Sequence, residues 1–218
     1  MGRSSAYGGL TINTHRFKDV AFTAKYKGPG GYKGSAVTVG AGIQVGELYK
    51  LAFEQSPKVT VVGGECATVG FAGGYIQGGG HGPLATLHGM AADQALSFNV
   101  VTAEGDIVKA NADENKDLFW ALRGGGPATF GVVTSVTVKT FPEVPSAGTI
   151  LDINSTHTTD PAVFWKGVEA FHAQANHFVD NGMKPARPAT LRPKYEFGEA
   201  VEGTKTTLRR SESQRSAI

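Results

Sequence analysis

The sequence predicts an α+β fold, and three observations support this prediction. Between residues 10 and 141, segments rich in Val and Thr alternate with segments whose apolar residues recur at helical spacing. Hydrophobic residues make up 40% of the 218 residues and charged residues 18%, so the chain can bury a core and is too weakly charged for a disordered protein. The 30 glycines form clusters without a fixed period, which excludes collagen and solenoid repeats.

The first expected elements are three strands and one helix. Residues 10–13 have the composition of a short strand, and residues 35–39 alternate β-branched side chains as a strand does. Residues 44–53 are expected to form a helix, because their apolar positions recur every three or four residues. Residues 59–62 form an apolar run that is typical of a buried strand.

The next elements form a predicted hairpin, a short helix and a long strand. Residues 95–102 and 107–110 are expected to pair as strands across a turn at Glu104-Gly105. Residues 115–122 have helical spacing, and residues 129–141 are rich in Val and Thr, which predicts the longest strand of the chain.

The character of the sequence changes after Pro142 and Pro145. Residues 160–181 are expected to form one amphipathic helix. From Pro185 onward the chain is rich in Pro, Arg and Ser and has few apolar residues to bury, so residues 203–218 in particular are expected to be disordered.

Charge and cysteine content exclude several classes of protein. With 21 basic and 19 acidic residues the net charge is +2, so neither a nucleic-acid partner nor a membrane partner is expected. Apolar runs are too short for a transmembrane helix. Cys66 is the single cysteine, which excludes a disulfide within the chain and a cysteine-cluster zinc site. The first residues lack an apolar signal core, so the chain as given is expected to carry no secretion address.

Nine glycines lie between residues 63 and 82, and this glycine block is the most informative part of the sequence. Bare backbone N–H groups can form a nest for an anion or a planar ring. The chain has neither the Gly-Lys-Ser/Thr of a P-loop nor a G-x-G-x-x-G fingerprint. A backbone-lined ligand groove and a set of turns in a β-rich domain, such as a carbohydrate-binding module, both remain open.

Three segments carry a resemblance to a known family. They read CATVGFAGGYIQGGGHGPL from residue 66, GMAADQ from residue 89 and DLFWALRGGGPATFGVVTSVTVKTFP from residue 117. In order and spacing they resemble the motifs of FAD-linked oxidases of the vanillyl-alcohol oxidase superfamily, more narrowly the fungal berberine-bridge-enzyme-like branch. The early GRSSAYGGLTINT is similar to the segment after the pyrophosphate loop of that family. The resemblance covers roughly residues 2–145 and implies an α+β, PCMH-type FAD-binding domain.

The resemblance implies a role for named residues. Ser4 and Ser5 would lie near the pyrophosphate, and Cys66 falls on the cysteine that forms a thioether to the flavin in many members. A thiolate is well suited to add to an electron-poor ring carbon, whereas most free cysteines are small buried hydrophobes. The remaining expected FAD contacts run along the glycine block and to the adenine end: Thr68, Gly70, Gly73, Gly74, Gly78, Gly79, Gly80, His81, Gly131 and Val133.

Five residues have two interpretations each. His81 and His88 lack a third ligand at a suitable spacing, so no metal site is expected. Phe119 and Trp120 lie on the predicted short helix, where aromatic residues are more often core than a stacking platform. Arg123 could face a phosphate or end a solvated helix.

The expected function is that of an FAD-dependent oxidoreductase. The resemblance implies hydride transfer from a small organic substrate to the flavin, with molecular oxygen as the acceptor. The alternative is a non-catalytic, truncated FAD-domain remnant with weak or no flavin binding, because the chain is expected to lack both ends of the family fold. No catalytic residue can therefore be named. Residues 1–145 are expected to be a partial FAD-binding domain, 146–184 the start of an antiparallel-sheet substrate domain, and 185–218 a disordered or aberrant tail.

Localisation is left open by the residues themselves. The resemblance suggests export, and the triplet beginning at Asn154 fits a glycosylation acceptor.

Overall fold

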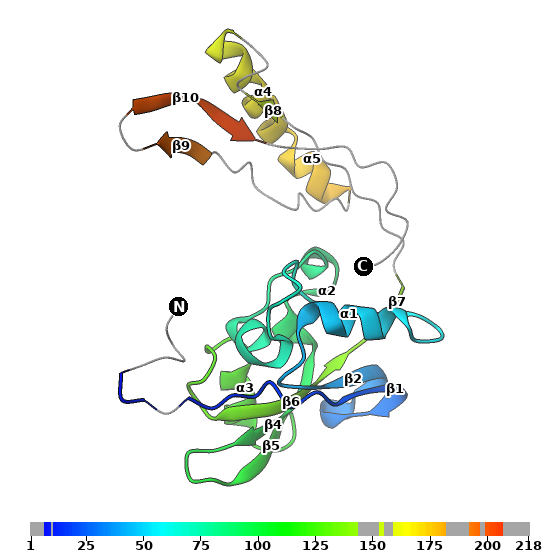
Figure 1. The fold of residues 1–218 in the computed structure, drawn as a ribbon. Coiled ribbons are helices and arrows are strands. Elements are labelled where there is room, and N and C mark those ends of the chain that lie inside the picture. The colour runs from blue at the N-terminus through cyan, green and yellow to red at the C-terminus, as the bar shows by residue number, and fades with distance from the viewer. Residues whose placement is uncertain are drawn as a thin grey trace. The chain divides into compact units, whose positions relative to one another are not determined.

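The computed structural model describes residues 7–9, 11–143, 153–154, 159–181, 192–196 and 199–206. The chain separates into two compact units, Met1–Val144 with Ala217–Ile218, and Pro145–Ser216. Figure 1 shows the elements of each unit. Ser4 and Ser5, which are expected near a pyrophosphate, lie outside the described residues.

The first unit is built on a five-stranded antiparallel sheet in the order β1-β2-β6-β4-β5. Two hairpins contribute two strands each, and β6, which is last along the chain, pairs between them. The strands are β1 (Val20–Lys27), β2 (Lys33–Gly40), β4 (Ala95–Val101), β5 (Ile107–Asn111) and β6 (Val132–Lys139). A separate two-stranded pair joins β3 (Val59–Thr60) to β7 (Phe141–Pro142). The α+β prediction is confirmed.

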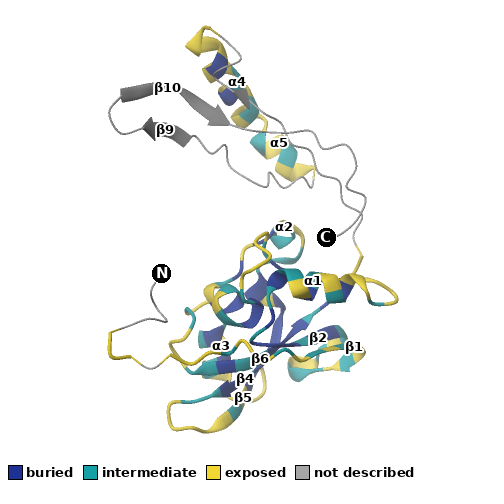
Figure 2. Ribbon diagram, viewed as in Figure 1, coloured by how far each residue is buried: buried dark blue, intermediate teal, exposed yellow. Residues whose placement is uncertain are grey.

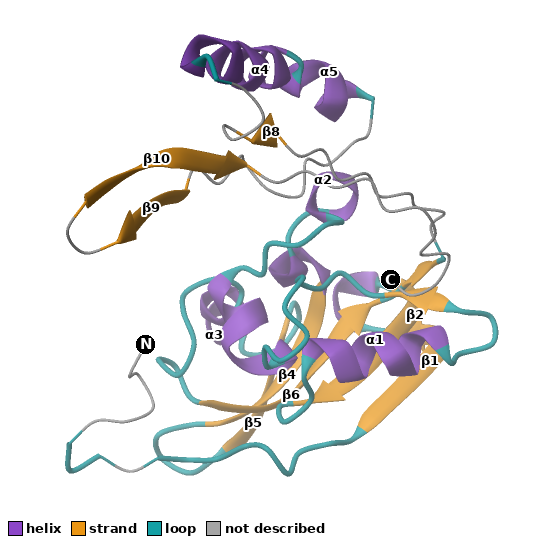
Figure 3. Ribbon diagram, turned by 45° about the horizontal axis from the view of Figure 1, so that its top comes forward, coloured by secondary structure: helices purple, strands orange, loops and turns teal. Residues whose placement is uncertain are grey.

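Helices and short helical turns cover one face of this sheet (Figure 3). The α-helices are α1 (Val45–Phe53), α2 (Ala85–His88) and α3 (Lys116–Leu122). The shorter turns on this face are η2 (Phe71–Tyr75), η3 (Ile76–Gly78) and η4 (Ala91–Gln94), whereas η1 (Pro29–Gly31) connects β1 to β2. The turns η2 and η3 belong to the glycine block, so the sheet and its core support the segment that carries the candidate site.

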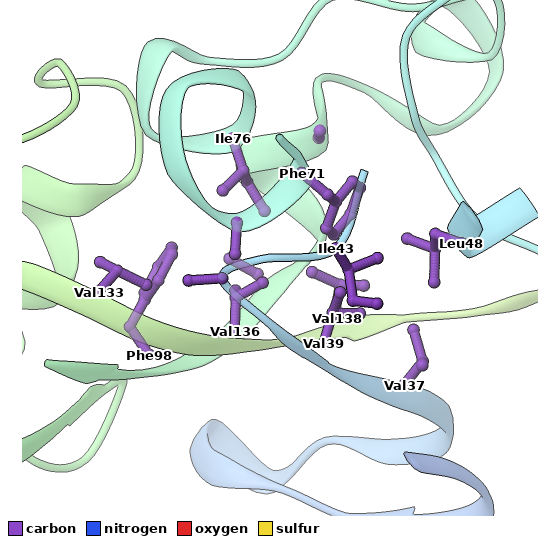
Figure 4. Close-up of a cluster of buried hydrophobic side chains, with 14 of the residues drawn as sticks. Val37, Val39, Ile43, Leu48, Phe71, Ile76, Phe98, Val133, Val136 and Val138 are labelled. Atoms are coloured by element: carbon purple, nitrogen blue, oxygen red, sulfur yellow. The ribbon is translucent and has the colours of Figure 1, made fainter. Parts of the chain in front are cut away.

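The core lies between the sheet and these helices, where Figure 2 shows the buried residues gathered. Strand alternation places Val37 and Val39 on the same face of β2, and their partners on β6 are Val138 and Val136. Figure 4 shows these side chains meeting Leu48, Phe71 and Ile76, which come from α1, η2 and η3. Each fully buried side chain of this size contributes about 1.5–3 kcal/mol. The glycine block is therefore attached to the sheet by its own apolar residues.

The second unit, by itself, contains a three-stranded antiparallel sheet and two helices. The strands β8 (Ile153–Asn154), β10 (Glu199–Thr206) and β9 (Arg192–Glu196) pair in that order. The helices are α4 (Pro161–Ala173) and α5 (Ala175–Asp180), and Phe164 and Val168 are the buried residues of α4. Asp160 caps α4 by accepting a hydrogen bond from the Ala162 amide at 2.8 Å.

The structure corrects several predicted elements. The described residues of 10–13 form no strand; the first strand is β1, whose largely exposed edge position leaves little apolar alternation to recognise. The predicted helix over 160–181 is interrupted at Gln174, which ends α4 and precedes α5. Strands β9 and β10 occupy part of the range expected to be disordered, because backbone pairing between them needs no apolar pattern. Residues 207–218 lie outside those described.

None of the helices in the described part of the chain is long and apolar enough to cross a membrane.

Candidate functional site

The glycine block has a buried side and an exposed side. Phe71, Ala72 and Ile76 are fully buried against the sheet. The residues expected to contact a cofactor lie mainly on the other side: Cys66, Thr68, Gly74, Gly78 and His81 are exposed, and Gly70, Gly73 and Gly79 are half-buried. Gly80 differs from these, because it is buried. The block thus presents a continuous run of backbone whose back is held by the core.

Four glycines of the block have open space where a side chain would be. A Cβ added at Gly70, Gly73, Gly74 or Gly78 would meet no atom within 4 Å. None of the four has φ in the left-handed region that favours glycine, since the positive-φ glycines lie elsewhere. Neither packing within this unit nor that conformation therefore requires glycine here. The missing side chains leave bare main chain facing outward, as a closely approaching ligand requires.

The other glycines of the block have a structural reason. A Cβ at Gly63 would meet the Tyr49 hydroxyl, and one at Gly82 would overlap the Gly63 carbonyl oxygen. Gly79 and Gly80 have φ of 100° and 72°, and a Cβ at Gly80 would lie 2.6 Å from that of Ala91. Turns and close packing explain these positions. The interpretation as a set of turns therefore applies to these glycines, and the interpretation as a ligand groove applies to the four open ones.

A tight turn over residues 66–69 carries Cys66 and Thr68. The Val69 amide donates to the Cys66 carbonyl at 3.2 Å and closes the turn. The start of α1 holds it, because the amides of Val45 and Gly46 donate to the carbonyls of Val69 and Ala67, both at 2.9 Å. The structure exposes Cys66, which removes the interpretation of this cysteine as a small buried hydrophobe.

Two tyrosines hold the glycine block from its buried side. The Tyr49 hydroxyl donates to the Gly64 carbonyl at 2.9 Å, and the Tyr75 hydroxyl lies 3.0 Å from the Gly80 carbonyl and 3.2 Å from the His81 carbonyl. Burial raises the pKa of Tyr75 to about 12 and raises the pKa of Tyr49 further still. Both hydroxyls are therefore protonated donors at neutral pH. Sequence reasoning missed both residues; the only available signal was that Tyr75 is a large aromatic residue among glycines, and Tyr49 gave none.

Gln77 links the block to the glycines at residues 124–126. Its backbone carbonyl accepts from the Gly126 amide at 2.9 Å, and its side-chain Nε2 donates to the Ala72 carbonyl at 3.1 Å. Gln77 is 3% exposed, and its Oε1 has no hydrogen-bond partner among the described residues. A buried acceptor of this kind normally has a hydrogen-bond partner, which a water molecule or a ligand can supply.

The predicted adenine-end residues lie at the start of β6. Gly131 has φ of 145°, and a Cβ there would lie 2.6 Å from the Val100 side chain, so close packing on β4 requires glycine. The Val133 side chain is buried in the core. Any ligand contact of Val133 therefore has to use its backbone, as the resemblance implies.

The structure decides between the interpretations of the aromatic residues on α3 and of Arg123, which follows this helix. Phe119 is buried as expected, but Trp120 is 79% exposed, so the expectation of a core position was wrong for Trp120. Consecutive helical residues point about 100° apart, and only one of the two can face the core. Arg123 donates from Nε to the Ala92 carbonyl at 2.8 Å and lies 3.5 Å from the Asp93 carboxylate, so a protein contact occupies its guanidinium.

The two histidines of this region have different environments. His81 is exposed in the block. The His88 ring stacks on Phe141 with a centroid distance of 3.8 Å, and burial lowers the pKa of His88. Within the described ranges, no group of three or more His, Cys, Asp or Glu residues could hold a metal ion.

Comparisons with known proteins agree on one family. Residues 1–111 match the model of an FAD binding domain. The chain is 46% identical over 182 residues to the FAD-linked oxidoreductase ZEB1 of Gibberella zeae, covering 84% of this chain and 31% of that protein. The crystal structure of the VAO-type flavoprotein MtVAO615 from Myceliophthora thermophila superposes with a TM-score of 0.71 at 43% identity, over 78% of this chain and 30% of that one.

A solved plant relative extends the likeness to the berberine-bridge-enzyme-like branch. The Physcomitrella patens BBE-like 1 structure matches with a TM-score of 0.52 at 36% identity, over 59% of this chain and 26% of that one. The chain spans about a third of the length of the curated relatives that it matches.

Proposed function

Because this chain belongs to the FAD binding domain family, within the vanillyl-alcohol oxidase superfamily, we propose that it holds FAD along the exposed side of the glycine block and takes part in an oxidoreductase reaction. Several of the relatives that it matches are FAD-linked oxidoreductases by name. We further propose that residues 1–145 are part of the FAD-binding domain and that residues 146–184 begin the substrate domain.

The observation that carries this proposal is the open space above Gly70, Gly73, Gly74 and Gly78. A side chain at any of these positions would fill space that the described residues leave empty. Bare backbone over such a length suits the flat ring and extended shape of FAD, so the residues present fit this cofactor. Packing among the described residues does not require glycine at these four positions, and none of the four has a left-handed backbone.

Each predicted contact has a role that follows from its position. Thr68, Gly70, Gly73 and Gly74 would lie along the flavin and the diphosphate. Further along the proposed site, Gly78, Gly79, Gly80 and His81 would continue the backbone surface, with Gly80 contributing only main-chain atoms because it is buried. At the adenine end Gly131 and Val133 would offer backbone groups, and Ser4 and Ser5 would lie near the pyrophosphate.

Cys66 is the proposed point of covalent attachment. Its turn is exposed and fixed to α1 by two hydrogen bonds, so the thiol lies beside the open glycines in sequence and on an ordered support. Thioether formation would replace the S–H bond and one ring C–H bond by a C–S bond. The two electrons and two protons released would pass to molecular oxygen, giving hydrogen peroxide.

Bound FAD would supply the redox chemistry by accepting hydride at its flavin. A small organic substrate such as an alcohol, a sugar or an alkaloid-like compound is proposed as the donor, and molecular oxygen as the final acceptor. The protein contributes binding and orientation through the backbone of the glycine block. A remnant that binds flavin weakly or not at all is the alternative outcome of the test that follows.

The absorption spectrum of the purified chain tests this function. We expect a visible flavin band after incubation with FAD, and a band that stays with the protein after denaturation if Cys66 forms the thioether. Replacing Cys66→Ala should then release the flavin on denaturation without abolishing its uptake. A protein that remains colourless in excess FAD would contradict the proposal and support the remnant.

A further inference from the structure

Tyr75 lies where the two ends of the glycine block approach each other. Added Cβ atoms at Gly64, Gly80 and Gly82 would come within 3.1, 3.0 and 3.1 Å of Tyr75 atoms. The Tyr75 ring packs on its other side near Phe71, with a centroid distance of 5.9 Å, and Phe71 is fully buried. Tyr75 is thus half-buried, and it packs between three glycines and the core residue Phe71.

The Tyr75 hydroxyl determines how two peptide groups of the block are turned. It lies within hydrogen-bond distance of both the Gly80 and the His81 carbonyl oxygens. In a trans peptide the C=O and the N–H of the following residue point in opposite directions. With the Gly80 carbonyl held toward the hydroxyl, the N–H of His81 points away from Tyr75. Tyr75 packs against the core residue Phe71, whereas His81 is exposed, so that N–H is directed away from this core contact.

The same contact prevents an unfavourable arrangement. If these two peptides rotated, carbonyl oxygens would face the surface that is proposed to receive FAD, which carries a diphosphate and electron-rich carbonyl groups. No acceptor among the described residues bonds to the backbone N–H of His81. This donor is therefore available for a ligand, and its direction depends on one phenol.

We propose that Tyr75 is a positioning residue that holds the His81 peptide with its N–H outward as a hydrogen-bond donor to FAD. This proposal rests on the proposed function, since it names a residue that prepares the same surface. The proposed role of Tyr75 is indirect: it touches no ligand and acts through the peptide that it holds.

The variant Tyr75→Phe tests the proposal, because it keeps the ring that packs on the glycines and removes only the hydroxyl. Tyr32→Phe is the matched control: the Tyr32 hydroxyl also donates to a backbone carbonyl, that of Ser35, at 2.8 Å, and belongs to no part of the glycine block. FAD is titrated into the full 218-residue chain, in a Cys66→Ala background so that binding stays reversible.

We expect Tyr75→Phe to raise the Kd for FAD about fivefold to tenfold, the size of one lost or misdirected hydrogen bond. Tyr32→Phe should change the Kd less than twofold. Urea unfolding of both variants measures the stability lost with each hydroxyl, which should be similar. Equal Kd values for the two variants would overturn the proposal, because the effect would then be a general loss of stability.

A second measurement needs no ligand. Residual dipolar couplings of the His81 N–H in the ligand-free protein report its direction, and we expect them to change in Tyr75→Phe and to stay constant in Tyr32→Phe. An unchanged His81 coupling in Tyr75→Phe refutes the positioning role. If the parent chain binds no FAD, the proposed function fails, and these couplings alone decide on Tyr75.

Discussion

The variant Gly70→Ala tests whether glycine at this position is needed for ligand binding or for folding. Gly70 has φ of −66° and ψ of 122°, a conformation that every residue adopts, and an added Cβ meets no atom within 4 Å. Alanine should therefore fit without strain. Because it restricts the unfolded chain, it should stabilise the fold by about 0.4–1 kcal/mol.

The same methyl group should interfere with FAD. It extends about 1.5 Å from the backbone, whereas carbon atoms in contact are about 3.5–4.0 Å apart. A flat ring lying on the bare backbone would have to lift away by much of that bond length. Overpacking of this kind typically costs about 1–3 kcal/mol, which corresponds to a rise in Kd of roughly 5-fold to 150-fold.

The assay is a pair of measurements on each variant: urea unfolding followed by circular dichroism, and FAD titration followed by flavin fluorescence. Gly105→Ala is the control with the opposite expectation. Gly105 also has open space, but its φ is 91°, so alanine should destabilise the fold by about 1–2 kcal/mol and leave the Kd unchanged. An unchanged Kd in Gly70→Ala, or a clear loss of its stability, would refute the reasoning that the open glycines receive a ligand.

Three further outcomes are expected from the fold and its titrating groups. Gly82→Ala should lower the free energy of unfolding by more than about 1 kcal/mol, because its Cβ would overlap the Gly63 carbonyl, which belongs to rigid backbone; a wild-type urea midpoint would contradict this. Phe98→Ala should cost about 3–5 kcal/mol, since Phe98 is fully buried, and thermal unfolding that matches the parent chain would argue against the described core. Burial lowers the pKa of His88, so the unfolded state binds the proton more tightly than the folded state does. The free energy of unfolding should therefore fall as the pH drops through the ordinary histidine pKa of about 6.5. His88→Phe keeps a ring on Phe141 and should flatten this pH dependence, which denaturation between pH 5 and pH 8 measures.

The strands and helices that form the core could be predicted from local pattern. Residues 35–39 and 95–102 alternate or cluster apolar side chains because their strands are central in the sheet, and the structure places β2 and β4 there. The edge strand β1 could not be recognised in the same way, because it buries few of its side chains. The alternation of apolar and polar residues reflects which side chains are buried, and an edge strand buries few of them.

The sequence predicts which segment forms the candidate site, and this stays a prediction, but the sequence does not predict how that segment is constructed. Motif order along the chain identified the glycine block, yet nothing in the sequence distinguishes Gly74, which is open, from Gly82, which packs on backbone. That difference depends on segments that approach only in three dimensions. The contribution of Tyr49 is likewise non-local, since its phenol donates to the carbonyl of Gly64, which belongs to another segment of the chain. Tyr75 binds carbonyls of its own segment, but no repeating pattern of the sequence indicates that contact.

The central position of β6 has a consequence for how the protein is made. Val39 on β2 pairs with Val136, and Phe98 on β4 pairs with the same residue, so neither hairpin acquires its inner neighbour until β6 has left the ribosome. During synthesis each of the two hairpins exposes an unpaired edge. The segment between them, which contains the glycine block, has no complete sheet to pack on until β6 pairs. The glycine block can therefore pack on its complete sheet only late in synthesis, after β6, which follows the block by some fifty residues, has emerged.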